Sequence, residues 1–479
     1  MYAPLHAAPP LLVKKVCTDN FEAAVAVKTH HDGITGTEKQ AVADDYELRL
    51  AIAETETRNM LVEALTLTAG LPDLTFCYGT LTLNVSFCPY TSNHNTFTIV
   101  AYNGLGHTVN QTLRIPISSG TASVTCSSTG DTVLAQTVPL SQRELSLPMY
   151  YLQYPEKLDP KRVANFTNNA THVLVFTATL PPVGYHTYAI KVGGGGDAVH
   201  TASAASHSIN QHKETEPMAT IANDYYKVTL DRATGTISQV TNLKTGVSTN
   251  LGLEVGFYKS SLGGCTRVNE TSTFGPDDPN LYPYRRREAY EFGMDDPVPI
   301  DKSGFICGIQ PSGAYIFRPN NSHVYPAACT MNGYCNKVPT FNITIGPLLQ
   351  EATIAFSDWA TVVLRLVVGQ PRIEVEYTVG PIPQQNFIKG DWPHLQGKEV
   401  VILYNSTLKT NGTFYTDSNA REMVKRVYNK RGSAYPVPYP IAEPVSGNYY
   451  PITTMIGLED EGNNVGLTVV VDRAWELLH

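Results

Sequence analysis

Long apolar runs and charged residues are both scarce in this sequence. No stretch of about 18 apolar residues occurs, so we predict no membrane-spanning helix. Asp, Glu, Lys and Arg make up 16% of the 479 residues, against about a quarter in an ordinary soluble domain. The net charge of −8 offers no attraction for the phosphates of nucleic acids or for anionic membranes. We therefore predict no nucleic-acid partner.

We predict no secretion signal at the start of the given sequence, because such a signal needs a basic patch followed by seven or more apolar residues. Only Leu11, Leu12 and Val13 are contiguous there. Asn-X-Ser/Thr glycan acceptor sites are nevertheless frequent, where chance would give roughly four. We therefore expect this sequence to be part of a larger, glycosylated protein of the secretory lumen. The nine sites begin at Asn84, Asn110, Asn165, Asn169, Asn269, Asn320, Asn342, Asn405 and Asn411.

The eight cysteines include no Cys-X-X-Cys pair, which argues against a zinc ribbon or a thioredoxin-like motif. Cys77 and Cys88 bracket two strand-like runs, and Cys329 and Cys335 bracket a short loop. Each pair could form a disulfide or consist of two buried thiols.

Residues from Thr37 to Leu67 follow the periodicity of a helix with one apolar face. Thr37 and Gln40 match a capping box, in which two side chains bond the free amides of the first turn. We expect the helix to begin there and to pack its apolar face against sheets that follow or helices that precede it.

After Gly70 the periodicity changes to the two-residue alternation of strands. The Asn103-Gly104 dipeptide predicts a hairpin between the strand-like runs Thr96–Ala101 and Thr112–Ile117. A second hairpin is predicted at 225–240. Further strands are expected at Thr361–Val368, Arg372–Val379, Val400–Tyr404 and Leu467–Val471, and a turn at Asn411-Gly412.

These patterns predict a mainly β fold with a short helical N-terminal part and antiparallel β-sandwich domains. The stretch after Gly193 is rich in Gly, Ala and Ser and resembles a linker. The predicted parts are an unassigned segment 1–20, a helical domain 21–72, a first sandwich 73–192, a linker 193–219 and a large C-terminal sandwich 220–479.

The most specific local feature is the loop sequence THHDGITGT, which starts at Thr29 and precedes the predicted helix. Adjacent residues on an irregular backbone point in different directions. We therefore expect His31 and Asp32 to act separately, one binding a metal and the other a substrate. A His-His-Asp run alone is weak support, because zinc needs three or four ligands and a solvated loop has the same composition.

With its flanks included, this segment resembles the glycoside hydrolase family 38 α-mannosidases, and further strings resemble the same family in the same order. Two of them look closest to the lysosomal branch. The strings are THHDGITGTEKQAVADDYELRL from 29, SGAYIFRP from 312, GPLLQE from 346, EVEYTVGPIP from 374, NGTFYTDSNAREM from 411 and GNYYPITTM from 447.

The resemblance implies a retaining, zinc-dependent α-mannosidase acting on mannose-containing oligosaccharides of glycoproteins in the lysosome or vacuole. It implies that His31 binds Zn²⁺, as one of four ligands, and that Asp32 and Tyr315 bind the sugar. It also implies a helical middle domain and a galactose-mutarotase-like supersandwich. The catalytic barrel, with the nucleophile, the acid/base and the other zinc ligands, has no counterpart in this sequence. We therefore predict that this chain alone is inactive.

The sequence departs from the family pattern in two respects, and two alternative hypotheses remain. Both ends of the chain leave the family's pattern, and Ala420 stands where the family usually has Gly. The chain could be a non-catalytic carbohydrate-binding module, since its 27 tyrosines offer rings for stacking on sugars. It could also be an aggregation-prone fragment whose N-terminal helix exposes an apolar face.

Overall fold

The computed structural model describes most of the chain. No helix within the described ranges is long and apolar enough to cross a membrane. The described residues are 10–34, 36–70, 74, 88–141, 143–145, 169–193, 217–260, 264–267, 305–309, 317–319, 321–328, 338–380, 382, 397–430, 445–472 and 475–478.

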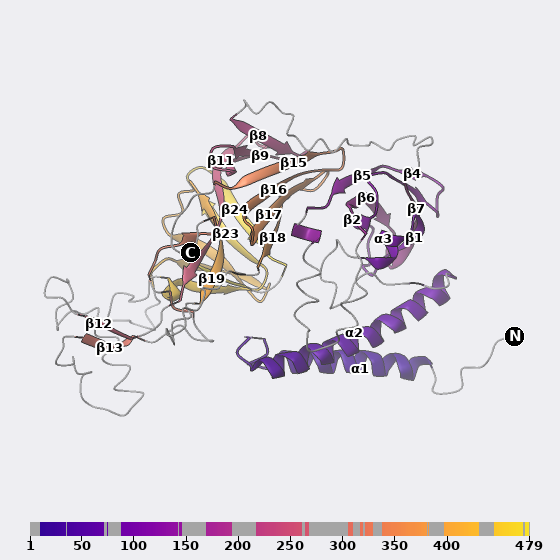
Figure 1. Ribbon diagram of the computed structural model, residues 1–479, viewed down its shortest axis with the longest axis horizontal. Coiled ribbons are helices and arrows are strands. Elements are labelled where there is room, and N and C mark those ends of the chain that lie inside the picture. The colour runs from indigo at the N-terminus through magenta and orange to yellow at the C-terminus, as the bar shows by residue number, and fades with distance from the viewer. Residues whose placement is uncertain are drawn as a thin grey trace. The chain divides into compact units, whose positions relative to one another are not determined.

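The predicted fold class is confirmed, because helices occupy the N-terminal part and antiparallel sheets follow it (Figure 1). The chain forms two compact units. The first contains Met1–Thr215, Asn342–Thr353 and Val363–Glu374. The second contains Glu216–Phe341, Ile354–Val362 and Val375–His479.

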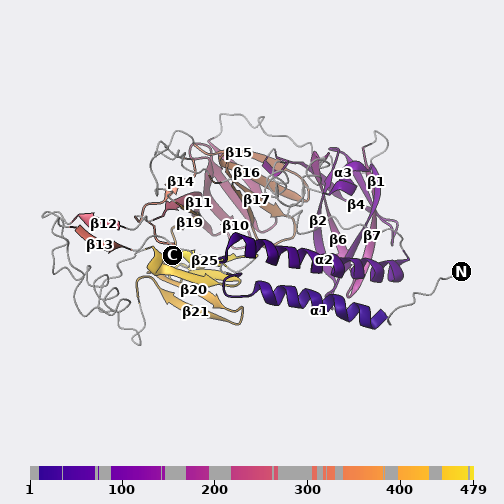
Figure 2. The same cartoon turned by 60° about the horizontal axis from the view of Figure 1, so that its bottom comes forward.

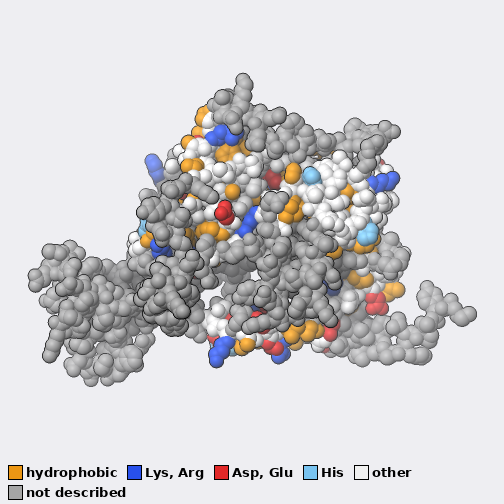
Figure 3. Space-filling view, viewed as in Figure 1, with side chains coloured by type: hydrophobic (Ala, Val, Ile, Leu, Met, Phe, Trp, Pro, Cys, Tyr) orange, Lys and Arg blue, Asp and Glu red, His pale blue; other side chains and the backbone are white. Residues whose placement is uncertain are grey.

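Two long helices, α1 (Pro10–Lys28) and α2 (Gln40–Ala69), lie side by side in the first unit (Figure 2). Charged and apolar side chains are mixed on the visible surface of this helical pair (Figure 3). Helix α2 ends at Gly70, whose φ of 64° allows its amide to bond the carbonyl oxygen of Thr66. The helix that we expected from Thr37 to Leu67 is therefore confirmed with slightly shifted bounds.

The predicted capping box is wrong. The N-cap of α2 is Lys39, which makes no side-chain capping bond. The hydroxyl of Thr37 instead donates to the carboxylate of Asp32 at 2.8 Å. Thr37 therefore organises the loop before the helix rather than the first turn of the helix.

The first unit also contains a two-sheet sandwich with strand orders β1-β7-β3-β4 and β2-β6-β5. Its core includes Ile117, Leu174, Phe176 and Ile190, all fully buried. The remaining elements of this region are α3 (Pro89–Asn93), β1 (Thr96–Asn103), β2 (Val109–Ile117), β3 (Ala122–Cys126), β4 (Thr132–Val133), β5 (Ala135–Pro139), β6 (His172–Leu180) and β7 (Gly184–Val192).

The strands β1 and β2 lie where the sequence predicts them, but the prediction that they form a hairpin with each other is wrong. Strand β1 pairs with β7 and β2 pairs with β6, so the two belong to different sheets. Asn103 supplies the physical reason: its amide nitrogen donates to the carbonyl oxygens of His107 (2.8 Å) and Pro181 (2.9 Å). The side chain thereby stabilises a corner between sheets instead of a tight turn.

The later elements are strands and one short 3₁₀ helix. They are β8 (Met218–Ala222), β9 (Tyr226–Asp231), β10 (Thr236–Asn242), β11 (Ser248–Lys259), β12 (Gly264–Arg267), β13 (Phe305–Ile309), β14 (Tyr325–Pro326), β15 (Thr340–Ile345), β16 (Leu349–Ser357), β17 (Ala360–Val367), β18 (Glu374–Val379), β19 (Lys398–Ser406), β20 (Thr413–Ser418), β21 (Glu422–Val427), η1 (Ser446–Asn448), β22 (Tyr449–Ile452), β23 (Met455–Asp460), β24 (Val465–Val470) and β25 (Trp475–Leu478).

The other strand predictions are confirmed. Strands β9 and β10 form the predicted second hairpin, with a bulge between Ile237 and Gln239. Strands β17, β18, β19 and β24 occupy the four expected runs. All eight residues of β17 are buried, including Arg365, which is typical of a strand covered on both faces.

Several sheets follow from these strands. The largest has the order β14-β11-β10-β9-β8, with β19 also paired to β11, and others have the orders β15-β16-β17-β18 and β21-β20-β23-β24. The turn between β20 and β21 contains Asn419 (φ 52°) and Ala420 (φ 56°), both in the left-handed region. Its preceding carboxylate, Asp417, is buried.

Most of the predicted linker lies outside the described residues. So do three of the four cysteines in the two predicted disulfides, namely Cys77, Cys329 and Cys335. Cys88 takes part in a disulfide, and Cys126 is a buried free thiol. The pairing of Cys77 with Cys88 therefore stays a prediction.

Candidate functional site

The loop between α1 and α2 begins where α1 ends at Lys28. The amide of His30 bonds the carbonyl oxygen of Val27, and the amide of Ile34 bonds the carbonyl oxygen of His30. The amides of Thr37 and Glu38 both bond the carbonyl oxygen of Asp32. The loop is thus closed by its own backbone before α2 starts.

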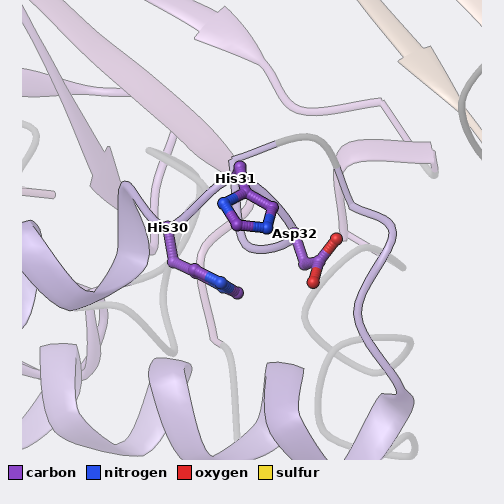
Figure 4. Close-up of side chains that lie close together, drawn as sticks. All are labelled: His30, His31 and Asp32. Carbon is purple, nitrogen blue, oxygen red and sulfur yellow. The ribbon is translucent and has the colours of Figure 1, made fainter.

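This loop gathers His30, His31 and Asp32 into one cluster (Figure 4). One possible ligand atom of each side chain lies within 4.8 Å of the others. The centroids of the two imidazole rings are 4.3 Å apart. Both histidines are exposed and Asp32 is half-buried. The expectation that adjacent side chains diverge here is wrong, because the tight turn folds them to one side.

Two side-chain hydrogen bonds orient this cluster. Thr37 donates its hydroxyl to Oδ1 of Asp32 at 2.8 Å, which fixes the direction of the carboxylate. The phenol oxygen of Tyr46, on α2, lies 3.3 Å from Nδ1 of His30. The ring of His30 is thereby tied to the second helix, and its Nε2 is the atom left for other ligands.

An ion pair fastens the base of the loop. Nζ of Lys28 lies 3.2 Å from Oε1 of Glu38, whose side chain is only 5% exposed. Nζ of Lys28 also lies 5.8 Å from the ring centroid of Tyr46. The pair connects the end of α1 to the residue before the N-cap of α2 and so holds the loop ends together.

Gly33 has a packing role at the centre of the loop. It is buried, and a Cβ atom placed there would lie 2.7 Å from the carbonyl oxygen of Lys28 and 3.0 Å from the ring of Tyr46. Any side chain at this position would push the loop away from the helices. Gly33 is therefore required for the close approach that places the three donors.

The cluster has the chemistry of a partial metal site. Imidazole nitrogen and carboxylate oxygen are zinc ligands, and zinc takes four ligands in structural sites and three with an open position in catalytic sites. A retaining glycosidase also needs two carboxylates about 5 Å apart, and the described part of this loop offers one close to the histidines. Asp45, on α2, bonds Arg49 at 2.7 Å on the exposed surface, as ordinary helix-surface acids do.

The structure places two of the three predicted site residues. His31 and Asp32 lie together, whereas Tyr315 lies outside the described residues. The roles of all three stay predictions. The sequence reasoning missed Gly33 and Tyr46 as positioning residues, because their importance depends on how α2 packs beside α1.

Comparison with known proteins identifies the family of this chain. Residues 221–477 match the C-terminal domain of glycosyl hydrolases family 38. A probable alpha-mannosidase of Arabidopsis thaliana is 31% identical over 471 residues, which cover 94% of this chain and 39% of that protein. The lysosomal alpha-mannosidase of Homo sapiens is 30% identical over 454 residues, covering 94% of this chain and 36% of that protein.

A more distant relative gives the same picture. The alpha-mannosidase of Canavalia ensiformis is 27% identical over 462 residues, covering 94% of this chain and 39% of that protein. The chain thus spans less than two fifths of the length of these relatives. Since the family match covers more than half of the chain, this protein belongs to glycosyl hydrolase family 38.

Proposed function

We propose that this chain contributes His31 and Asp32 to the zinc-dependent active site of an α-mannosidase. The observation that supports the proposal is the cluster of three donor atoms within 4.8 Å of one another, in a chain of family 38. In this proposal His31 binds the metal, Asp32 accepts hydrogen bonds from sugar hydroxyls, and Tyr315 contacts the same sugar.

The donor set fits zinc, since neutral imidazole and carboxylate are among its usual ligands. Zinc, when bound, would polarise the hydroxyl oxygens of mannose and favour the flattened ring of an oxocarbenium-like transition state. Thr37 would keep the carboxylate of Asp32 turned toward the sugar. Tyr46 would keep the ring of His30 beside His31.

The proposed substrates are mannose-containing oligosaccharides of glycoproteins, and the proposed location is the lumen of the lysosome or vacuole. The names of the human and mouse relatives, both lysosomal alpha-mannosidases, support the location. We further propose that this chain alone does not turn over α-mannosides. Removing one catalytic carboxylate alone costs about 4–6 kcal/mol of transition-state stabilisation, and this loop offers one carboxylate beside the histidines, because Glu38 is paired with Lys28.

Zinc binding tests the metal proposal directly. Titration calorimetry of the full chain should give a zinc affinity that falls about tenfold or more in His31→Ala. His94→Ala is the matched control, because His94 is exposed and stacks on Tyr90, away from the loop in sequence. Equal zinc affinity in the wild type and in His31→Ala would contradict the metal role.

Hydrolysis of a chromogenic α-mannoside tests the proposal about activity. The full chain with added zinc should release no product above the uncatalysed rate. Co-expression with the N-terminal portion of a family relative should give turnover that His31→Ala and Asp32→Asn abolish and His94→Ala leaves unchanged. Turnover by the chain alone that disappears in His31→Ala would refute the proposed inactivity.

A second candidate function is carbohydrate binding without catalysis. Tyr90 is 42% exposed, and its ring stacks on His94 with centroids 4.3 Å apart. Such a flat aromatic surface can pack on the face of a sugar ring. Glycan binding that is unchanged in His31→Ala and lost in Tyr90→Ala would favour this function.

A further inference from the structure

Two neighbouring strands of the second unit bring a pair of lysines together. Strands β11 and β19 are antiparallel, and Lys259 lies directly opposite Lys398 in their register. Residues opposite each other on adjacent strands project from the same face, with Cβ atoms about 4.5–5.5 Å apart. Both lysines are half-buried. Like charges placed in this way destabilise a sheet, so the arrangement favours a negative charge beside it.

The acidic residues of these two strands lie on the opposite face. Strand β11 contains one acid, Glu254, and β19 contains one, Glu399. Each is an odd number of positions from the lysine on its own strand, and side chains alternate between faces along a strand. Glu254 also accepts a hydrogen bond from Asn405 at 3.2 Å. Neither strand therefore supplies a carboxylate to the face that carries the lysines.

Aromatic rings hold the two ammonium groups at this face. Nζ of Lys259 lies 4.2 Å from the ring centroid of Tyr325. Nζ of Lys398 lies 5.7 Å from the ring centroid of Phe257. The two rings stack on each other with centroids 5.6 Å apart. An aromatic ring attracts a cation through its quadrupole and carries no net charge, so it orients each ammonium group without neutralising it.

A histidine borders the pair. The rings of His323 and Tyr325 meet edge to face with centroids 4.6 Å apart, and His323 is exposed. Asn321 orients both residues: its Oδ1 accepts from the amide of His323 at 2.9 Å, and its Nδ2 donates to the phenol oxygen of Tyr325 at 3.3 Å. The ring of Tyr325 thus contacts both Lys259 and His323, which places an imidazole beside the lysines.

The charges of the two lysines interact at a fixed separation of the strands. Burial lowers the pKa of Lys398, and the nearby charge of Lys259 lowers it further. The strands are held together directly beyond the pair, where the amide of Ser260 bonds the carbonyl oxygen of Gly397 at 2.9 Å. A bound anion would oppose both effects on the pKa, because it favours the protonated ammonium groups.

We propose that Lys259, Lys398 and His323 form a binding site for a phosphate group. A phosphate monoester carries a charge of about −1.5 to −2 near neutral pH and three acceptor oxygens, which match two ammonium groups and one imidazole. A carboxylate carries half of that charge and should bind more weakly. Free phosphate and a phosphorylated sugar share this chemistry. The site is separate in sequence from the His31 cluster and does not depend on the proposed mannosidase activity.

Calorimetric titration of the full chain, without zinc and at low ionic strength, tests the proposal. Inorganic phosphate and glucose 6-phosphate are the probes, and at least one of them should bind with a Kd of about 1 mM or less. Glucose and acetate should bind at least about tenfold more weakly than that probe. Lys259→Gln and Lys398→Gln should each weaken its binding about tenfold. Lys259→Arg, which keeps the charge, should change its affinity by less than about threefold.

Lys244→Gln is the matched control. Nζ of Lys244 lies 4.8 Å from the ring centroid of Tyr225 in the same unit, but Lys244 belongs to the turn after β10 rather than to a cross-strand pair. This variant should bind phosphate as the wild type does. His31→Ala should also retain the binding, which separates this site from the metal cluster. Thermal unfolding of each variant shows whether it is folded.

The outcomes identify the ligand or reject the site. Tighter binding of glucose 6-phosphate than of inorganic phosphate would identify a sugar ester as the ligand, and the reverse order would identify free phosphate. Binding that is unchanged in both Lys259→Gln and Lys398→Gln would overturn the proposal. Acetate binding as tight as that of both phosphate probes, or no binding of either probe by the folded wild type, would overturn it as well.

Discussion

The side-chain amide of Gln136 pairs with the backbone of Leu349. Nε2 of Gln136 donates to the carbonyl oxygen of Leu349 at 3.1 Å, and Oε1 accepts from its amide at 3.0 Å. Oε1 also accepts from the amide of Leu348 at 3.0 Å. Both Gln136 and Leu349 are buried, so this side chain satisfies the start of β16 as a neighbouring strand would.

Removing this amide should destabilise the first unit. Gln136→Ala leaves the buried amide and carbonyl of Leu349 without their partners, and we expect the free energy of unfolding to fall by about 3 kcal/mol. Urea denaturation followed by circular dichroism measures it. A loss below about 0.5 kcal/mol would contradict the role of Gln136.

Substitutions at Gly346 and Gln136 should have non-additive effects on the free energy of unfolding. A Cβ atom at Gly346 would overlap the side-chain amide of Gln136, so Gly346→Ala should cost about 1–3 kcal/mol in the wild-type background. The cost should fall in the Gln136→Ala background, where the space is open. Equal costs in both backgrounds, measured as a double-mutant cycle, would show that the two positions are independent.

Glu351 should make the protein more stable under acidic conditions. Its carboxylate is buried and lies 3.1 Å from the guanidinium of Arg365. Burial raises the pKa of Glu351, and the nearby charge of Arg365 offsets part of that rise. A raised folded-state pKa contributes stability that is complete below the unfolded value of about 4.3 and is lost as the pH rises through the folded value.

The comparison with Glu351→Gln isolates this effect. The stability difference between the wild type and Glu351→Gln should move against the wild type as the pH rises from about 4. Urea denaturation at several pH values provides the measurement. A difference that moves in favour of the wild type over the same range would mean that the pKa of Glu351 is lowered instead.

Asp417 should have the opposite pH dependence. Burial raises its pKa, but hydrogen bonds from Thr453, Thr454, Met455 and Ala420 lower it more, and the net pKa lies well below the ordinary range. Two of its bonds, from the amides of Thr453 and Thr454, measure 2.9 and 3.0 Å. Such a carboxylate contributes stability that is complete above the unfolded pKa and is lost as the pH falls.

Asp417→Asn should therefore be less stable than the wild type at neutral pH, and the difference should shrink below about pH 4. Thermal unfolding followed by circular dichroism at neutral and acidic pH measures it. The control is Asp131→Asn, since Asp131 is an exposed residue of a turn in the first unit. If Asp417→Asn is less stable than the wild type by the same amount at acidic and at neutral pH, the charge of Asp417 is not the cause of the difference.

Ala420→Gly should stabilise the turn between β20 and β21. Ala420 has a φ of 56°, a left-handed conformation that costs a residue with a Cβ about 1–2 kcal/mol. Glycine adopts it freely but loses more entropy on folding, so we expect a net gain of about 1 kcal/mol in the free energy of unfolding. The amide that bonds Asp417 at 2.8 Å is retained. A lower stability of the glycine variant would contradict this account.

Strand positions could be predicted from the sequence because alternation of apolar residues is a local property. The pairing of those strands could not. Asn103-Gly104 has the sequence of a tight turn, yet Asn103 bonds the carbonyl oxygen of Pro181, 78 residues away. The energy of such a contact depends on the sandwich already being assembled, and no local pattern encodes it.

The candidate site, too, could be predicted from the sequence only in part. The grouping of His30, His31 and Asp32 lies in one short run, so the sequence could mark the loop. The capping role predicted for Thr37 failed because its hydroxyl had a competing acceptor in Asp32. The contact of His30 with Tyr46 depends on the packing of two helices, which periodicity alone does not define.

The hydrogen bonds of Asn103 also affect where this protein deamidates during storage. Asparagine before glycine loses its amide when the next backbone nitrogen attacks the side-chain carbonyl carbon, and asparagine is accordingly a thermolabile residue. At Asn103 three hydrogen bonds hold the amide in place, so that attack is blocked. At Asn411 the turn is exposed, so of the two Asn-Gly pairs that the structure describes, this one should convert to aspartate first in stored samples.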